Sequence, residues 1–229
     1  PCAMNQEFCL ALAMAYAHPF PNNPYYQNQR MRELVIAAIE FAKKSSHADG
    51  SCDDYFPFER ALGALVFSTY AMTEAYQLLD LARPDLVDFF RLRGDWLRKH
   101  NETGQLANHQ ALAALALYNV YLVTGDPVYL KSSQAFRDLT LSWQHAEGWF
   151  QEYEGADPGY HSCSIDFCQI SAKRNIPEVR NPKQEIEFDI RAGCARSGKA
   201  KQCSKFRVGI QASLDHIGTG NSQRFKRGL

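Results

Sequence analysis

The sequence contains no long apolar run and no excess of charge of either sign. No eighteen consecutive residues are all apolar, which argues against a membrane-spanning helix. The 229 residues carry 25 basic and 25 acidic side chains, and this balance argues against nucleic-acid binding driven by bulk charge. Glycine-rich phosphate loops, a Ser–His–Asp order and metal-spaced clusters are also missing. The sequence therefore predicts no cofactor, no nucleic-acid partner and no membrane span.

Cysteine pairs at metal-binding or redox spacing are missing as well. The seven cysteines are odd in number and none forms a CxxC pair, so neither a zinc site nor a redox motif is indicated. Cys9 lies within a helical apolar pattern and is predicted to be a core residue. The chain begins within that pattern, as a fragment or a processed product would, and the cellular compartment stays open.

The even charge balance conceals two segments of opposite sign. Residues 1–170 carry 12 basic and 20 acidic side chains, whereas residues 171–229 carry 13 and 5. Apolar periodicity is lost after Phe167, where Gly, Pro and basic residues scatter. We therefore predict a helical domain over residues 1–167 and a basic, irregular or disordered tail over residues 168–229. Two origins of the tail stay open: a native extension, or a sequence that a shifted reading frame would produce.

Apolar side chains recur at helical spacing through the first domain. Proline and glycine at the segment ends give start and stop signals. Two of the predicted helices are apolar nearly all round and two are amphipathic, so the apolar ones must be covered on both sides, as the inner layer of a two-layer array. The predicted helices cover residues 5–17, 27–44, 57–79, 84–99, 108–124 and 127–145, and a further one begins after Asp157.

The apolar helices repeat at a nearly constant interval. Glu59, Asn108 and Tyr160 occupy equivalent places at the starts of successive inner helices and are 49 and 52 residues apart. A period near fifty with two helices per unit is typical of an α/α hairpin repeat. We therefore predict an all-α fold, a two-layer array of three and a half hairpins that forms an incomplete (α/α) toroid.

Polar and aromatic side chains gather where the predicted inner helices begin. If the repeat geometry holds, these starts converge on one rim. Aromatic rings among carboxylate, amide and imidazole groups suit sugar binding, because rings stack on pyranose faces and polar groups bond to hydroxyls. The candidate residues are Asp54, Tyr55, Glu59, Arg60, Asn108, His109, Gln110, Trp149, Glu152, Tyr153, Asp157, Tyr160 and His161.

Most of these side chains also have a plain structural interpretation. Asn108 can cap its helix, and Asp54 and Asp157 can cap helices that begin at Pro57 and Pro158. Glu59 would complement a helix dipole. Asn119, which lies mid-helix among apolar residues, is expected to meet a buried partner rather than a ligand.

Three segments resemble the α/α-toroid domain of heparinase II/III-like polysaccharide lyases: "DGSCDDYFPFERALGALVFSTYAMTEAYQLL", "LANHQALAALALYNVYLVTGD" and "EGWFQEYEGADPGYHSCSIDF". The resemblance implies β-elimination at a uronic acid, which needs a group that neutralises the carboxylate, a base and an acid. The resemblance implies that Asn108 holds the substrate carboxylate and that His109 acts as the base or as a neutralising group. It implies that Tyr160 is the acid or the base, with His161 as a substitute. Gln110, Glu59 and Arg60 would bind the substrate.

Two other functions stay open beside a lyase acting on an acidic polysaccharide or oligosaccharide. A toroid glycoside hydrolase or sugar epimerase would use rim carboxylates, and the acidic first domain suits a polyanionic substrate poorly. A non-catalytic helical-repeat scaffold would use the rim residues only as caps. We further expect His109 and Tyr160 to face one cleft, and the 229-residue chain to have weak or no activity.

Overall fold

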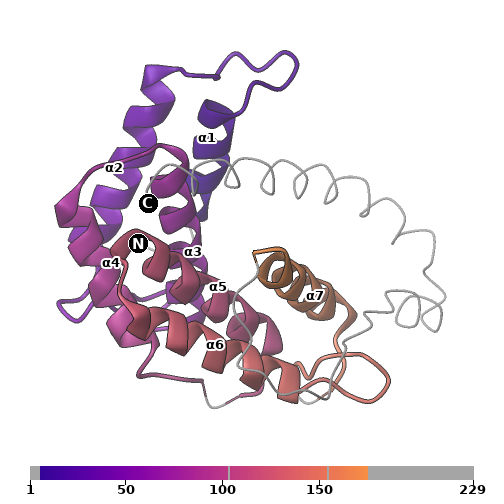
Figure 1. Cartoon of the computed structure of the whole chain (residues 1–229). Helices are drawn as coiled ribbons and strands as arrows, with labels where there is room; N and C mark the ends of the chain where they lie inside the picture. The colour runs from indigo at the N-terminus through magenta and orange to yellow at the C-terminus, as the bar shows by residue number, and fades with distance from the viewer. Residues whose placement is uncertain (1–5, 103, 154, 175–229) are drawn as a thin grey trace.

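The computed structural model describes residues 6–102, 104–153 and 155–174 (Figure 1). These residues form helices and contain no strand, which confirms the predicted all-α class. Most of the predicted segments are helical, with boundaries displaced by a few residues. The helices are α1 (Phe8–Ala17), α2 (Gln29–Ser45), α3 (Leu62–Leu78), α4 (Pro84–Leu97), α5 (Ala107–Thr124), α6 (Pro127–Ser142) and α7 (Pro158–Lys173).

The helices pack as successive hairpins. Each odd-numbered helix lies beside the next, so that α1 contacts α3, α3 contacts α5 and α5 contacts α7 (Figure 1). The even-numbered helices pack against this row from outside. Helices α3 and α5 are buried along almost their whole length, as their all-round apolar sequences predict, and Leu65, Leu115 and Leu117 are fully buried at their contact.

The turn from α5 to α6 shows how the sequence ends one helix and starts the next. Gly125 adopts a left-handed conformation (φ 71°), which places its N–H on the Tyr121 carbonyl and stops α5. The Asp126 side chain then accepts a hydrogen bond from the Val128 N–H at 3.0 Å, and Pro127 occupies the first turn of α6. A two-residue connection therefore forces α5 and α6 to lie antiparallel.

Connections differ in length at the two ends of the array. The turns that follow α3 and α5 are short, whereas the segments that precede α3, α5 and α7 are longer, as is the α1–α2 connection (18–28) at the same end as the short turns. We call the end formed by residues 46–61, 98–102, 104–106, 143–153 and 155–157 the long-loop rim. The starts of the inner helices therefore lie at this rim, where the candidate residues were predicted to gather.

The predicted helix start at Pro57 is wrong, because α3 begins only at Leu62. Phe58 and Arg60 have positive φ values of 65° and 51°, which interrupt a right-handed helix. The residue at the N-cap is Ala61, which has no capping side chain. The prediction that Asp54 caps this helix, and that Glu59 lies in its first turn, is therefore also wrong.

Helix α7 crosses the boundary that we predicted at Phe167 and ends at Lys173. Beyond Phe167, Cys168 and Ser171 are buried. Arg174, which follows the helix, forms an ion pair with Glu74 of α3 at 2.6 Å and donates to Asn119 Oδ1 of α5 at 2.8 Å. Asn119 is itself buried and meets protein partners, as predicted, although Glu74 and Arg174 are only partly buried. The rest of the predicted tail, residues 175–229, lies outside the described residues.

Candidate functional site

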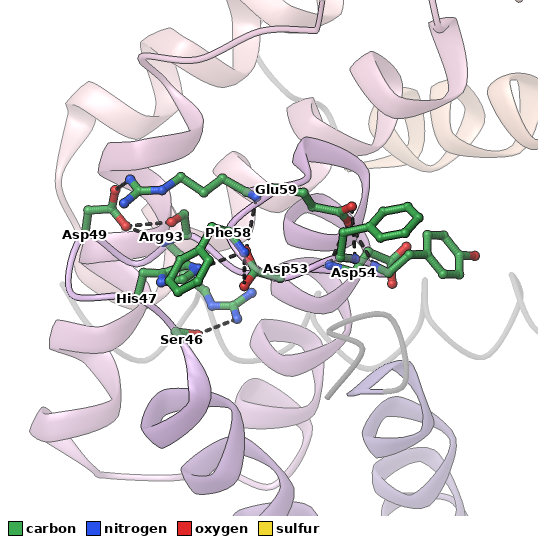
Figure 2. A network of polar contacts seen from close by, with 12 residues as sticks. Ser46, His47, Asp49, Asp53, Asp54, Phe58, Glu59 and Arg93 are labelled. Carbon is green, nitrogen blue, oxygen red and sulfur yellow. Dashed lines mark hydrogen bonds and ion pairs between the residues drawn. The ribbon is translucent and has the colours of Figure 1, made fainter.

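Two carboxylates fix the backbone of the loop before α3 (Figure 2). Glu59 accepts hydrogen bonds from the N–H groups of Asp54, Tyr55 and Phe56 at 2.8 to 3.2 Å. Asp53 accepts from the N–H groups of Phe58 and Arg60, residues whose φ values are positive. Charge-assisted bonds of this kind are stronger than neutral ones. These hydrogen bonds therefore hold the loop in a conformation with positive φ values at Phe58 and Arg60, which a right-handed helix excludes.

This loop displays aromatic side chains to solvent. Tyr55, Phe56 and Phe58 are 78%, 71% and 79% exposed, although large apolar side chains are usually covered. Because the backbone beneath them is fixed, binding a flat apolar surface would cost little ordering of the loop. We call Tyr55, Phe56 and Phe58 the aromatic loop. The sequence analysis identified Tyr55 and Phe56 but did not single out Phe58.

A hydrogen bond and an ion pair tie the aromatic loop to the segment that follows α2. The His47 ring lies 2.8 Å from Asp53 Oδ1, and Arg60 pairs with Asp49. Partial burial alone would raise the pKa of Asp53, but the hydrogen bonds from His47 and from two backbone N–H groups lower it. Asp53 is therefore ionised at neutral pH and holds the loop as a carboxylate. Arg60, a predicted substrate contact, is engaged with Asp49.

The start of α5 is capped by a side chain from a distant loop. Glu152 is buried, and its Oε1 accepts hydrogen bonds from the Asn108 N–H and from the Ser164 hydroxyl, both at 2.7 Å. Burial raises the pKa of Glu152, and the two hydrogen bonds oppose that shift. The prediction that Asn108 is the N-cap is wrong, because α5 begins one residue earlier and Leu106 occupies that position.

Asn108 and Gln110 point into the protein rather than to solvent. The Asn108 Oδ1 accepts from the His109 N–H at 2.7 Å, and the residue is buried. Gln110 is fully buried, and its amide donates to Asn101 Oδ1 at 2.5 Å. Both side chains organise the start of α5, where direct contact with a ligand would first require them to be uncovered.

His109 is held between a carboxylate and the start of α3. Its Nδ1 lies 2.8 and 2.9 Å from the two carboxylate oxygens of Glu102. Because Nδ1 faces a carboxylate, it donates its proton to Glu102, which leaves Nε2 as the ring atom that could exchange a proton with a ligand. The ring also meets the edge of the Phe67 ring and lies so close to Gly63 that an added Cβ there would stand 2.8 Å from Cε1. Gly63 therefore makes room for the imidazole.

The start of α7 carries the remaining candidates. Asp157 accepts from the N–H groups of Gly159 and Tyr160, so the prediction that it caps this helix is confirmed. Tyr160 is exposed, and its ring lies 5.5 Å from that of Tyr153. His161 is half-buried, and its Nδ1 accepts the Phe150 N–H at 3.2 Å.

Burial lowers the pKa of His161, so the ring is neutral at physiological pH.

Trp149 stacks on His145, with ring centroids 4.3 Å apart, on the hairpin that precedes α7. This hairpin, closed by the bridge between Gln144 and Phe150, ends α6 at Ser142, earlier than we predicted. Trp149 is therefore displayed by a turn and not by a helix.

The structure joins neighbouring helix starts in pairs. His109 links α5 to α3 through Gly63, and Glu152 links α5 to α7 through Asn108 and Ser164. Tyr160 packs on Tyr153 instead. That His109 and Tyr160 face one cleft therefore stays a prediction. Glu102 was missed, since it lies in an irregular loop seven residues before its partner.

No protein-family model, curated protein or solved structure matches the chain. Within the described ranges, no three His, Cys, Asp or Glu side chains are grouped so that they could hold a metal ion. In the same residues, no helix combines the length and apolarity that crossing a membrane requires. The chemistry of the rim therefore has to follow from the contacts of its own side chains.

Proposed function

We propose that the long-loop rim binds acidic carbohydrate and that the chain is a lyase-like toroid domain that cleaves uronic-acid glycans by β-elimination. The observation that supports this most directly is the aromatic loop, whose exposed rings stand on a backbone hydrogen-bonded to Glu59 and Asp53, at the same rim as the pair of His109 and Glu102. Aromatic rings of this kind stack on sugar faces, and an imidazole held by a carboxylate is a suitable general base.

In the proposed reaction, Nε2 of His109 removes the proton next to the uronate carboxylate. Glu102 keeps the ring oriented and stabilises the imidazolium that forms. The Tyr160 hydroxyl protonates the glycosidic oxygen as the carbon–oxygen bond breaks, which leaves an unsaturated uronate and a new sugar end. Asn108, to which the resemblance gives the neutralisation of the uronate carboxylate, is buried and accepts the His109 N–H, so the proposed reaction requires the substrate to uncover its side chain.

Hydrolysis is less well supported than elimination. A glycoside hydrolase needs two carboxyl groups beside the scissile bond. Glu59 and Asp157 accept several backbone N–H groups each, and Glu152 is buried under the start of α5. These carboxylates therefore have structural partners, which is what a binding scaffold also predicts for them.

A panel of uronate polysaccharides tests the proposal. Elimination creates a conjugated double bond, so ultraviolet absorbance should rise with time, even if slowly. His109→Gln and Tyr160→Phe should abolish the rise, whereas Tyr26→Phe, an exposed tyrosine between α1 and α2, should not. Glycan binding without any absorbance change would reduce the function to binding. The proposal would be refuted if no polysaccharide of the panel bound to the chain and none gave a rise in absorbance.

A further inference from the structure

A pocket of about 400 Å³ opens at the long-loop rim, away from His109. Its wall comes from four separate parts of the chain: the turn before α1, the end of α2, the aromatic loop and helix α4. The volume lies within the range of sites for small ligands. The residues that matter below are Gln6, Ser46, Tyr55, Phe56 and Arg93, all of which line it.

Arg93 brings a buried positive charge to this pocket. The side chain reaches from α4 toward Ser46, next to the loop that carries Asp53 (Figure 2). The residue is 1% exposed, and its guanidinium donates to the hydroxyls of Ser68, Thr69 and Ser46 at 2.7 to 3.2 Å. All its hydrogen-bond partners among the described residues are uncharged, and it forms no ion pair with them.

A buried cation without a counter-charge is unfavourable. Removing a guanidinium from water has a large desolvation cost, and hydroxyl partners offset only part of it. The face of the Phe89 ring, 4.9 Å from the guanidinium carbon, adds a weak cation–π attraction. The Asp53 carboxylate lines the adjoining pocket but is bonded to His47 and to two backbone N–H groups, so an anion that contacts the guanidinium would provide the missing direct counter-charge.

Two unsatisfied polar atoms show what else the pocket needs. The Arg93 Nε–H and the Gln6 Oε1 are both buried, and neither has a hydrogen-bond partner within the described parts of the chain. One is a donor and the other an acceptor, although both residues line the same pocket. A ligand that completes them must therefore offer an acceptor to Arg93 and a donor to Gln6.

We propose that this pocket binds a small organic acid that carries one carboxylate and several hydroxyl groups, such as a monomeric sugar acid. The carboxylate accepts from Arg93, a hydroxyl donates to Gln6, and the carbon skeleton lies against Tyr55 and Phe56. Asp53 and Asp54 also line the pocket. Their negative charge repels a phosphate dianion more strongly than a single carboxylate, and carboxylate oxygens accept hydrogen bonds from hydroxyls.

This site is separate from the pair of His109 and Glu102 and does not depend on elimination. It uses Arg93, a residue with no part in the proposed reaction. Binding of a monomer that contains no glycosidic bond can therefore succeed when the lyase assay fails, and the reverse outcome is equally distinguishable.

Calorimetric titration of the full 229-residue chain with sodium D-glucuronate tests the inference. We expect saturable binding that is at least about tenfold tighter than for D-glucose or for inorganic phosphate. Arg93→Met should weaken glucuronate binding at least about tenfold, and Gln6→Leu should weaken it less. Arg91→Met, which removes an exposed charge from the same helix, should leave it unchanged.

Circular dichroism of each variant controls for folding, and Gln6→Leu provides the test if Arg93→Met does not fold. Absence of glucuronate binding by the wild-type chain would overturn the inference. So would equal affinity for glucose or phosphate, because the charge and the hydroxyl groups would then not both be recognised. Unchanged affinity in the folded Arg93→Met or Gln6→Leu variant would overturn it as well.

Discussion

Two arginines with little exposed surface differ in whether a carboxylate of the fold neutralises them. Arg174 is 15% exposed and pairs at 2.6 Å with Glu74, itself 13% exposed, at the end of the array away from the long-loop rim. Arg93 lies at the rim, and its partners among the described residues are three hydroxyl groups and the Cys52 thiol, none of them a carboxylate. Burial would lower the pKa of both, but Glu74 reverses the direction for Arg174. The first site is electrostatically complete within the fold, and the second is not.

The largest effect is expected when the ion pair of Arg174 and Glu74 is broken. Glu74→Gln should lower the free energy of unfolding by about 3 kcal/mol, because it leaves Arg174 buried without a counter-charge. Urea denaturation measures this. As a control, Asp88→Ala removes an exposed partner of Arg91 at 3.9 Å and should cost less than about 1 kcal/mol. Equal costs for the two variants would show that the bridge contributes no more than a surface pair.

The next effect tests how the loop near Arg93 is held. Gly50 has a φ of 85°, and an added Cβ would lie 2.6 to 2.8 Å from backbone atoms of Leu92 and Arg93. Gly50→Ala should therefore lower the free energy of unfolding by about 1 to 3 kcal/mol. Gly104→Ala, whose Cβ would meet nothing closer than 3.7 Å, serves as the matched control. An unaffected denaturation midpoint for Gly50→Ala would mean that this loop does not pack on α4.

Replacing each arginine by methionine distinguishes the two sites directly, because the free energy of unfolding should respond in opposite directions. Arg93→Met should leave the free energy of unfolding within about 1 kcal/mol of the wild type, or raise it, since an uncompensated buried charge is removed. The hydroxyls of Ser68 and Ser46 also donate to backbone carbonyls and keep those bonds. Arg174→Met should instead destabilise, because it leaves Glu74 unpaired. Similar losses for both variants in urea would contradict the comparison.

The smallest effect concerns pH. Glu152 has a raised folded-state pKa, so its contribution to stability declines as pH rises above its ordinary value of 4.5. Asp53 has a lowered folded-state pKa, so its contribution is complete above 3.8 and is lost as pH falls below it. Across a pH series of urea denaturations, Glu152→Gln should gain on the wild type with rising pH. Asp53→Asn should become less stable relative to the wild type as pH rises through the acidic range, because only the wild type gains the contribution of the ionised carboxylate. Parallel curves would contradict both signs.

The sequence predicted the helices better than the ends of the helices. Apolar periodicity indicated both inner helices correctly, and Asn119 among apolar neighbours indicated a protein partner. The helix start at Pro57 was misplaced, because nearby carboxylates on Asp53 and Glu59 bind the backbone that a helix would use. Propensity at Pro57 gave no sign of that competition.

The candidate site was predicted as a neighbourhood rather than as a set of contacts. Repeat spacing brought the inner-helix starts to one end, but the cap on α5 comes from Glu152, 44 residues away, and no local pattern encodes it. Arg93 lies in an amphipathic helix where arginine is normally solvated. Its burial depends on how the loop at Gly50 covers α4, which only tertiary packing determines.

The unequal connections bear on how this fold can diverge. The two-residue turn between α5 and α6 fixes an antiparallel hairpin and tolerates no change of length. The long segments at the opposite end can grow or shrink cheaply, since doubling a flexible loop costs only about 0.6 kcal/mol in closure entropy. Three of the four longer segments lie at the end that holds the aromatic loop and the Arg93 pocket, so insertions and deletions should accumulate there more than at the opposite end, whose one longer segment is residues 18–28. Related proteins that keep the same helix packing could therefore bind different ligands at this end.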